Sequence, residues 1–192
     1  MIGAHNTLTA YRALTVWGWL FTWIWRCQSK KLDQLINEGV HMFDIRVCRH
    51  VDRKGREYWT GAHGPVSINI SPMACLLYIN RRCLNTGATV RLILERGHEE
   101  DRRAFVQFCS DAEKYCPAIQ FTGGRYKPTW EQLYKFSADL PDGMIEQHVG
   151  SMDPKPLRRL VGKVCPRLWH RLWGRHIPTP DTTAIHMLAD FL

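Results

Sequence analysis

One short apolar run, VHMFDIRV at Val40 to Val47, constrains the fold more than any other part of this sequence. Its valine, isoleucine and phenylalanine residues predict a buried β-strand, which is entered at Glu38-Gly39 and left by a charged loop. Side chains two apart on a strand share a face, so Asp44 and Arg46 are expected on the same side. Burying an acid and a base is costly unless they are paired or used. Taken alone, the pair indicates a structural ion pair.

Predicted strands and helices alternate along the rest of the chain. The strands lie within Ile2–Thr9, Val40–Val47, Tyr58–Ala62, Thr89–Glu95, Ala118–Gly123, Gly143–Gly150 and Thr183–Leu192, and the helices within Tyr11–Trp25, Ser29–Glu38, Ser71–Leu84, Glu99–Tyr115 and Thr129–Ser137. This alternation is typical of a parallel α/β fold. Seven strand candidates are one fewer than a complete barrel needs, so we expect a compact TIM-type (β/α) barrel that is incomplete or irregular. One strand, expected to be the seventh in order, is missing or lies unseen in the basic stretch Lys155–His176, which Pro166 must break or kink.

Length and composition limit the class of protein. A chain of 192 residues without repeats or low complexity is expected to form a single domain over residues 1–192. Its formal net charge of +8 and its eight tryptophans indicate an anionic partner, either a phosphate-bearing lipid surface or a nucleic acid. Seven cysteines without a C-x-x-C pair argue against a disulfide framework and a structural zinc site, and favour free thiols in a reducing compartment.

The longest apolar run, Ala13 to Trp25, is too short to span a bilayer and lacks the cleavage pattern of a signal peptide. The sequence therefore predicts no transmembrane segment and a cytoplasmic or peripheral membrane location, although a truncated gene start would hide an export signal. A helix that is apolar nearly all round is usually buried, which is our expectation here. The rival interpretation is that some of Trp17, Trp19, Trp23 and Trp25 stay exposed and enter a lipid interface.

Polar residues stand at or near the ends of most predicted strands: His5, Arg46, His63, Glu95, His148 and Asp190. In a closed α/β barrel such ends converge on one mouth, where the chemistry of these folds takes place. Glu95 and Asp44 could equally be structural partners of arginines, and the place of His148 at the mouth is left open. The remaining histidines are expected at the surface or in packing: His41, His50, His98, His170, His176 and His186.

Several short motifs resemble, in order, those of phosphatidylinositol-specific phospholipase C and its wider superfamily of PLC-like phosphodiesterases. They are GAHNT at Gly3–Thr7, the helix-then-strand segment Arg26–Val47 with its D-I-R, HG at His63-Gly64, LILE at Leu92–Glu95 and MLADF at Met187–Phe191. The resemblance covers most of the chain and is weakest between Gly97 and Pro180. It implies a general base at His5, a general acid at His63, and an Asp190 carboxylate that orients His5.

The resemblance also bears on metals. Arg46 falls where the metal-independent bacterial enzymes place an arginine and the calcium-dependent enzymes a metal ligand, which implies neither a calcium requirement nor another cofactor. Asn6, by contrast, is the residue type of the calcium-dependent branch. A weakened oxygen-ligand site at Asn6, Asp44 and Glu95 therefore remains an alternative to their role, with His148, in binding the substrate.

These residue types suit one reaction. A phosphodiester beside a free hydroxyl is cleaved by internal attack, which needs a base, an acid and a positive charge on the phosphate. Histidine suits both proton roles, and a guanidinium holds two phosphate oxygens in a fixed fork. The resemblance implies that the substrate is phosphatidylinositol or a related phospholipid at an anionic membrane surface. With phosphatidylinositol, the expected products are diacylglycerol and a cyclic inositol phosphate.

Two other functions stay open. RNA also offers a hydroxyl beside its phosphodiester, and the chain is basic with many aromatic residues, but it carries no RNA-recognition motif in the right context, so a nucleic-acid partner is disfavoured. The second is an inactive barrel that recruits a membrane or a partner through Lys155–Arg175. Leu168, Trp169, Leu172 and Trp173 are interleaved with the basic residues of that stretch, which fits either an anionic membrane or a solvated outer helix.

Overall fold

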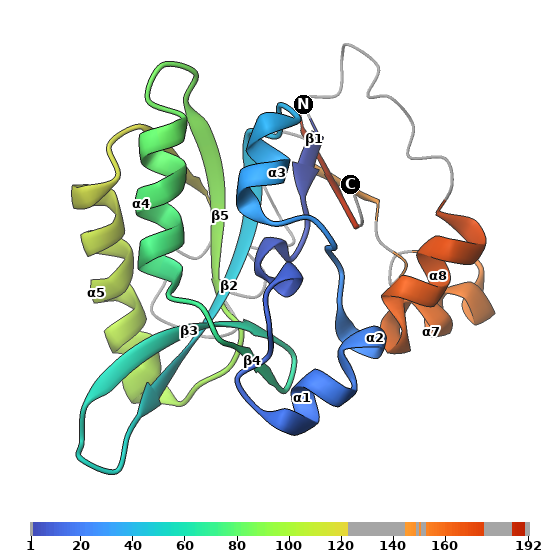
Figure 1. The fold of residues 1–192 in the computed structure, drawn as a ribbon, viewed down its shortest axis with the longest axis horizontal. Helices are drawn as coiled ribbons and strands as arrows, with labels where there is room; N and C mark the ends of the chain where they lie inside the picture. Colours follow the sequence, from blue (N-terminus) through green and yellow to red (C-terminus); the bar gives the residue numbers. More distant parts are fainter. Residues whose placement is uncertain (1, 123–144, 149, 151–152, 175–185, 191–192) are drawn as a thin grey trace.

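The protein is described by a computed structural model over residues 2–122, 145–148, 150, 153–174 and 186–190 (Figure 1). The strands are β1 (Ile2–Ala4), β2 (Met42–Val51), β3 (Glu57–His63), β4 (Val66–Ile68), β5 (Ala88–Leu94), β6 (Ile119–Thr122), β7 (Ile145–His148) and β8 (His186–Ala189). The helices are η1 (Thr7–Ala10, a 3-10 helix), α1 (Val16–Leu20), α2 (Thr22–Trp25), α3 (Leu32–Asn37), α4 (Pro72–Arg82), α5 (Glu99–Tyr115), α7 (Pro156–Val164) and α8 (Pro166–Trp173). The helix predicted at Thr129–Ser137 lies outside the described residues.

Six strands form the parallel part of one sheet, in the order β6, β5, β2, β1, β8, β7. Among the described residues, β6 and β7 are each paired on one edge only. The expected α/β class is confirmed, whereas the pairing does not show the closed TIM-type barrel that the sequence suggested. The first and last strands of the chain lie side by side, because β1 pairs parallel with β8 (Figure 1).

The strand predicted at Tyr58–Ala62 exists, but the expectation that it runs parallel to its neighbours was wrong. β3 pairs antiparallel with the outer half of β2, from Val47 opposite Gly61 to Val51 opposite Glu57. Only residues 52–56 separate the two strands, whereas a parallel connection needs a crossover of about a dozen residues or more. β4, which the sequence did not predict, extends this hairpin antiparallel to β3 and so does not supply the missing barrel strand.

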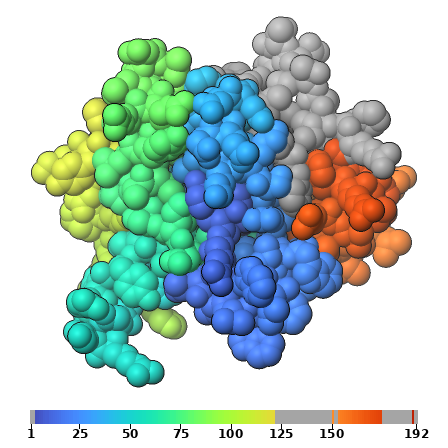
Figure 2. Space-filling model, in the orientation of Figure 1, coloured from blue at the N-terminus to red at the C-terminus, as the bar shows by residue number. Residues whose placement is uncertain are grey.

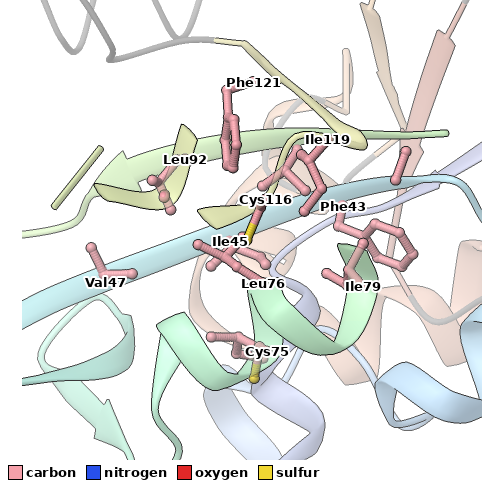
Figure 3. Packing of buried hydrophobic residues seen from close by; sticks show 14 of the residues in the cluster. Phe43, Ile45, Val47, Cys75, Leu76, Ile79, Leu92, Cys116, Ile119 and Phe121 are labelled. Atoms are coloured by element: carbon pink, nitrogen blue, oxygen red, sulfur yellow. The ribbon is translucent and has the colours of Figure 1, made fainter. Parts of the chain in front are cut away.

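The central strand β2 separates an apolar face from a charged one. Phe43, Ile45 and Val47 point into the hydrophobic core, where they meet Leu76 and Ile79 of α4 (Figure 3). The alternate side chains Asp44 and Arg46 therefore point to the opposite face, because successive side chains on a strand alternate. β5 follows the same pattern: Val90, Leu92 and Leu94 belong to the core, and Arg91 lies on the charged face beside Asp44.

The N-terminal apolar segment differs from the buried helix that we expected. It forms two short helices, α1 and α2, and three of its four tryptophans are largely exposed: Trp17 by 72%, Trp19 by 52% and Trp23 by 55%. Thr15 caps α1 by accepting a hydrogen bond from the Gly18 amide at 3.1 Å. The rival interpretation is confirmed for the exposure of Trp17, Trp19 and Trp23, whereas Trp25 is partly buried against the core. Entry of the exposed rings into a lipid interface stays a prediction.

The described part of the basic stretch is helical and holds no strand. Pro166 ends one helix and begins the next, as the sequence predicted, so that α7 and α8 pack together and α8 lies against α2 (Figure 1). Trp169 is only 4% exposed and its indole donates a hydrogen bond to Asp153 at 2.9 Å, so this side chain of the stretch does not face a membrane. In the described residues, no helix is long and apolar enough to cross a membrane.

Candidate active site

Strand register places His5 between two carboxylates. Ala4 of β1 lies opposite Phe43 on β2 and opposite Ala189 on β8, so the next residues along the three strands, His5, Asp44 and Asp190, are neighbours. The Nδ1 atom of His5 lies 2.7 Å from Oδ1 of Asp190, and its Nε2 atom lies 3.5 Å from Oδ2 of Asp44. All three residues are buried. The His5 ring therefore contacts the Asp190 carboxylate at Nδ1 and lies beside the Asp44 carboxylate at Nε2.

Arg46 connects this pair to the neighbouring strand. Its guanidinium donates to Oδ2 of Asp44 at 3.2 Å and to Oε2 of Glu95 at 3.1 Å. A third contact joins Nη2 to Nε2 of His5 at 2.9 Å. Because a guanidinium only donates, Nε2 of His5 must be the unprotonated nitrogen and Nδ1 must carry the proton that Asp190 accepts. This tautomer leaves the lone pair of a base directed toward Arg46.

The β2–β3 hairpin brings His63 back to the same place. Nδ1 of His63 lies 2.6 Å from the carbonyl oxygen of Trp25 and donates to it, which leaves Nε2 facing the site, 4.0 Å from Sγ of Cys27. The adjacent Gly64 amide donates to Oε1 of Glu95 at 2.7 Å. Burial, together with the charge of Arg46, lowers the pKa of His63 to about 4. In the free protein, His63 is therefore neutral around pH 7.

Asp44 is held between two arginines. Arg91 stands opposite it on β5, with Nε 3.6 Å from Oδ1, and both side chains are buried. Burial alone would raise the pKa of Asp44, but the charges of Arg46 and Arg91 outweigh it and hold that pKa well below its usual value. Arg91 was not among the site residues predicted from the sequence. The signal was a charged residue in the middle of the buried strand TVRLILE, two positions from Ile93 and four from Glu95 on one face.

Asn6 occupies a strained backbone position inside the site. Its φ of 47° is the one positive value among the non-glycine residues of the described chain, and such strain is common at functional sites. Its amide nitrogen donates to Asp44 at 3.2 Å, and its side-chain Nδ2 lies 3.4 Å from the His5 ring and 3.5 Å from Sγ of Cys27. Burial raises the pKa of the Cys27 thiol. No sequence motif marked Cys27 as a site residue.

The structure thus brings seven predicted site residues into one cluster: His5, Asn6, Asp44, Arg46, His63, Glu95 and Asp190. The eighth, His148, is the last residue of β7 and pairs in register with Ala189, while its side chain lies outside the described residues. The alternative oxygen-ligand set fits calcium poorly, because Asp44 and Glu95 are already paired with Arg46 and Asp44 also faces Arg91. The roles of these residues stay predictions.

Comparison with known proteins gives a limited result. No protein-family model and no curated protein matches the chain. Among solved structures, it is similar to phosphatidylinositol-specific phospholipase C from Listeria monocytogenes, with 15% identity over 64% of this chain and 49% of that one and a TM-score of 0.46. It is also similar to a Staphylococcus aureus phosphatidylinositol-specific phospholipase C mutant, with 14% identity over 64% and 48% of the two chains and a TM-score of 0.43. The chain spans about half the length of these proteins, and the similarity concerns the fold alone.

Proposed function

We propose that the protein is a phosphodiesterase that cleaves phosphatidylinositol or a related phospholipid by general acid-base catalysis without a metal. The observation that carries this proposal is that two histidines and an arginine lie together at one site. His5 contacts Arg46 at 2.9 Å, and His63 lies close enough to both residues for their charges to affect its pKa. The products would be diacylglycerol and a cyclic inositol phosphate.

The two histidines are suited to opposite proton roles. His5 presents an unprotonated Nε2, backed by the Asp190 carboxylate at 2.7 Å on the other nitrogen, and accepts the proton of the inositol hydroxyl next to the phosphate. The resulting oxygen attacks phosphorus and expels the diacylglycerol oxygen. His63 is held by the Trp25 carbonyl at Nδ1, so its Nε2 is the atom that gives a proton to the leaving oxygen.

Arg46 is the candidate phosphate clamp. Asp44 and Glu95 hold its Nε and Nη1 atoms, so the guanidinium is fixed in place while Nη2 faces the base. A phosphate oxygen that takes over the Nη2 contact would free the lone pair of His5 and place the phosphorus beside it. Substrate binding and activation of the base are therefore one event at Arg46.

The charge of the site links binding to protonation. The site holds three carboxylates, Asp44, Glu95 and Asp190, and two arginines, Arg46 and Arg91. An anionic phosphodiester adds a further negative charge, which favours the protonated form of the neighbouring His63. Binding is therefore expected to take up a proton at His63, and this proton is the one that the leaving group needs.

An exposed surface next to the site supports a membrane substrate. Trp17, Trp19 and Trp23 are exposed on α1 and α2, and α2 ends at Trp25, whose carbonyl contacts His63. Helix α8 continues this surface beside α2 (Figure 2). The groove between them, about 690 Å³, is lined by the arginines Arg26, Arg167 and Arg171 and by Trp23 and Leu168, with no acidic residue among its described lining. Exposed tryptophans beside arginines suit an anionic lipid interface.

An assay of the purified chain on phosphatidylinositol vesicles, with and without EDTA, tests the proposal. Diacylglycerol and a cyclic phosphate, the latter detected by phosphorus NMR, are expected in both conditions. His5→Ala and His63→Ala should each lower the rate by about 10²- to 10⁴-fold, the usual contribution of one general acid or base. His98→Asn, which changes an exposed histidine before α5, serves as the control and should keep the rate.

Three results would contradict the proposal. Loss of turnover with EDTA would show that the site needs a metal. Cleavage of single-stranded RNA without cleavage of any phospholipid would replace the lipid by a nucleic acid. No turnover of either substrate by a folded chain would indicate a binding module.

A further inference from the structure

A thiol, an imidazole and a carboxylate meet inside the site in a way that the proposed reaction does not use. Cys27 follows α2 by two residues, His5 follows β1, and Asp190 follows β8. One ligand atom from each of the three lies within 4.8 Å of the other two, and all three residues are buried. Sequence spacing could not have revealed this set, because its members come from three distant parts of the chain.

The distances suit a small tetrahedral ion. Metal–ligand bonds of 2.0–2.3 Å in a tetrahedron separate the ligand atoms by about 3.3 to 3.8 Å. In the protein, the ligand atoms of His5 and Asp190 are 2.7 Å apart, which is closer than this range, and no two ligand atoms of the set are more than 4.8 Å apart. Small side-chain rotations would therefore complete the geometry without movement of the strands.

The side-chain amide of Asn6 is an independent observation that points to a ligand at this place. Its side chain is 2% exposed, and its Oδ1 atom is buried without a hydrogen-bond partner in the described part of the chain. The other end of the same amide, Nδ2, lies 3.5 Å from Sγ of Cys27. A half-turn of the amide would place Oδ1 beside the sulfur, where a cation could take it as a fourth ligand.

We propose that His5, Cys27 and Asp190 bind Zn²⁺ or another thiophilic divalent cation, with Asn6 as the additional ligand, and that this cation inhibits the site. Binding of the cation does not depend on the proposed phosphodiesterase reaction, whereas inhibition by the cation rests on that proposed function. Cys27 would bind as the thiolate, and its proton would leave to solvent. Because His5 and Asp190 would both turn to the metal, the base would lose its lone pair and its orienting carboxylate together.

Charge and donor type favour this cation over calcium. The buried site has three carboxylates against two arginines, so a divalent cation and one thiolate would compensate it. Thiolate and imidazole donors select zinc and its neighbours, whereas calcium prefers oxygen ligands alone. The proposed site is also distinct from the set of Asn6, Asp44 and Glu95, because it avoids the two carboxylates that Arg46 already holds.

The test uses the metal alone. Isothermal titration calorimetry with Zn²⁺ is expected to show one site per chain, and Co²⁺ should give a thiolate-to-metal charge-transfer absorption. Cys27→Ala should abolish that absorption and weaken Zn²⁺ binding by more than about tenfold. Cys75→Ala, which changes another buried cysteine, is the matched control and should leave both unchanged. Cys48→Ala is the second control, because Sγ of Cys48 lies 3.2 Å from Nε2 of His50 in a competing thiol-imidazole pair.

The possible outcomes test the proposed metal site separately from the proposed phosphodiesterase function. Absence of Zn²⁺ binding by the folded wild-type chain, retention of binding in Cys27→Ala, or its loss in Cys48→Ala would overturn the site. If Cys27→Ala does not fold by circular dichroism, Asp190→Asn replaces it, with the same expected loss of affinity and with retained affinity again overturning the site. In the phosphatidylinositol assay, Zn²⁺ should inhibit the wild type, and full activity at saturating Zn²⁺ would overturn the inhibition. Zn²⁺ binding by a chain without turnover would contradict the proposed function alone.

Discussion

At the scale of single residues, the site is a connected network of polar and charged side chains. Each side chain in the network is held in place by a contact with the next. Asp190 holds His5, His5 accepts from Arg46, and Arg46 is shared between Asp44 and Glu95. Such a buried network is expensive to break, because removal of one member leaves another charge buried without a partner. Stability and chemistry are therefore coupled at these positions.

Asp44→Asn should lower the free energy of unfolding by about 3 to 5 kcal/mol at pH 7, because it leaves Arg46 and Arg91 undercompensated in a buried site. Urea denaturation measures this difference. The folded-state pKa of Asp44 is lowered, so its contribution is present above the unfolded value of about 3.9 and is lost as the pH falls below it. The control Glu57→Gln changes the exposed partner of Arg49 and should cost much less, because water screens an ion pair at the surface. An equal loss in both variants would contradict the role of Asp44.

The lowered pKa of His63 predicts a second dependence of the protein's stability on pH. Its pKa falls from 6.5 to about 4 in the folded protein, so the unfolded chain binds the proton first. The stability contributed by neutral His63 is complete above about pH 6.5 and is lost as the pH falls toward 4. Thermal unfolding of His63→Asn should therefore depend less on pH in this window than unfolding of the wild type. His98→Asn should follow the wild type, and identical curves for His63→Asn and the wild type would refute the buried neutral histidine.

At the scale of elements, the β2–β3 hairpin decides where His63 lies. β2 continues past the site to Val51, and the tight turn at residues 52–56 returns the chain antiparallel, so that His63 ends beside Glu95. Asp52 closes this turn by accepting from the amides of Lys54 and Arg56 at 2.8 and 2.9 Å. The general-acid candidate therefore depends on a turn at the far end of the hairpin.

Gly55 is the test of that turn. Its φ of +74° lies in the left-handed region, which costs a residue with a Cβ atom about 1 to 2 kcal/mol. Gly55→Ala should lower the melting temperature in differential scanning calorimetry, whereas Gly55→Asn should be closer to the wild type because asparagine tolerates this conformation. Equal melting temperatures for the alanine variant and the wild type would argue against the turn.

At the scale of the whole molecule, the exposed tryptophans and the basic helices form one surface beside the site. Figure 2 shows α1 and α2 next to α7 and α8 on the molecular surface. Arg12 lies over the Trp19 ring at 5.8 Å, so cationic and aromatic groups are interleaved there. A chain with a formal charge of +8 should therefore approach anionic vesicles by long-range attraction and hold them by its tryptophans.

Replacing Trp17, Trp19 and Trp23 together by alanine should weaken co-sedimentation with anionic vesicles by tenfold or more, because each exposed ring contributes apolar area at the interface. Binding of the wild type should also fall as salt rises, since the exposed charges are screened. The control Tyr115→Ala removes an exposed aromatic residue from the end of α5 and should leave binding unchanged. Unaltered binding of the triple variant would remove the membrane role from α1 and α2.

Much of the fold follows from local pattern. The strands at Val40–Val47 and Thr89–Glu95 and the helix at Glu99–Tyr115 are found close to their expected positions, because a buried strand and an amphipathic helix each carry a strong period in their own sequence. Exposure of the N-terminal tryptophans could not be predicted in this way. An apolar helix has the same sequence pattern whether it is buried in the protein or exposed at its surface.

The residues of the site also fall into two groups, those that the sequence predicted and those that only the structure placed there. The sequence by itself determined which chemical groups are available to the site, and short motifs that resemble those of a known family were enough to select His5, Arg46, His63 and Asp190 as candidates. Only the tertiary structure decided that Arg91 and Cys27 join them, that Arg46 already contacts His5, and that His63 arrives on an antiparallel strand. The physical reason is that register and strand direction depend on pairing between distant segments, which no local period encodes.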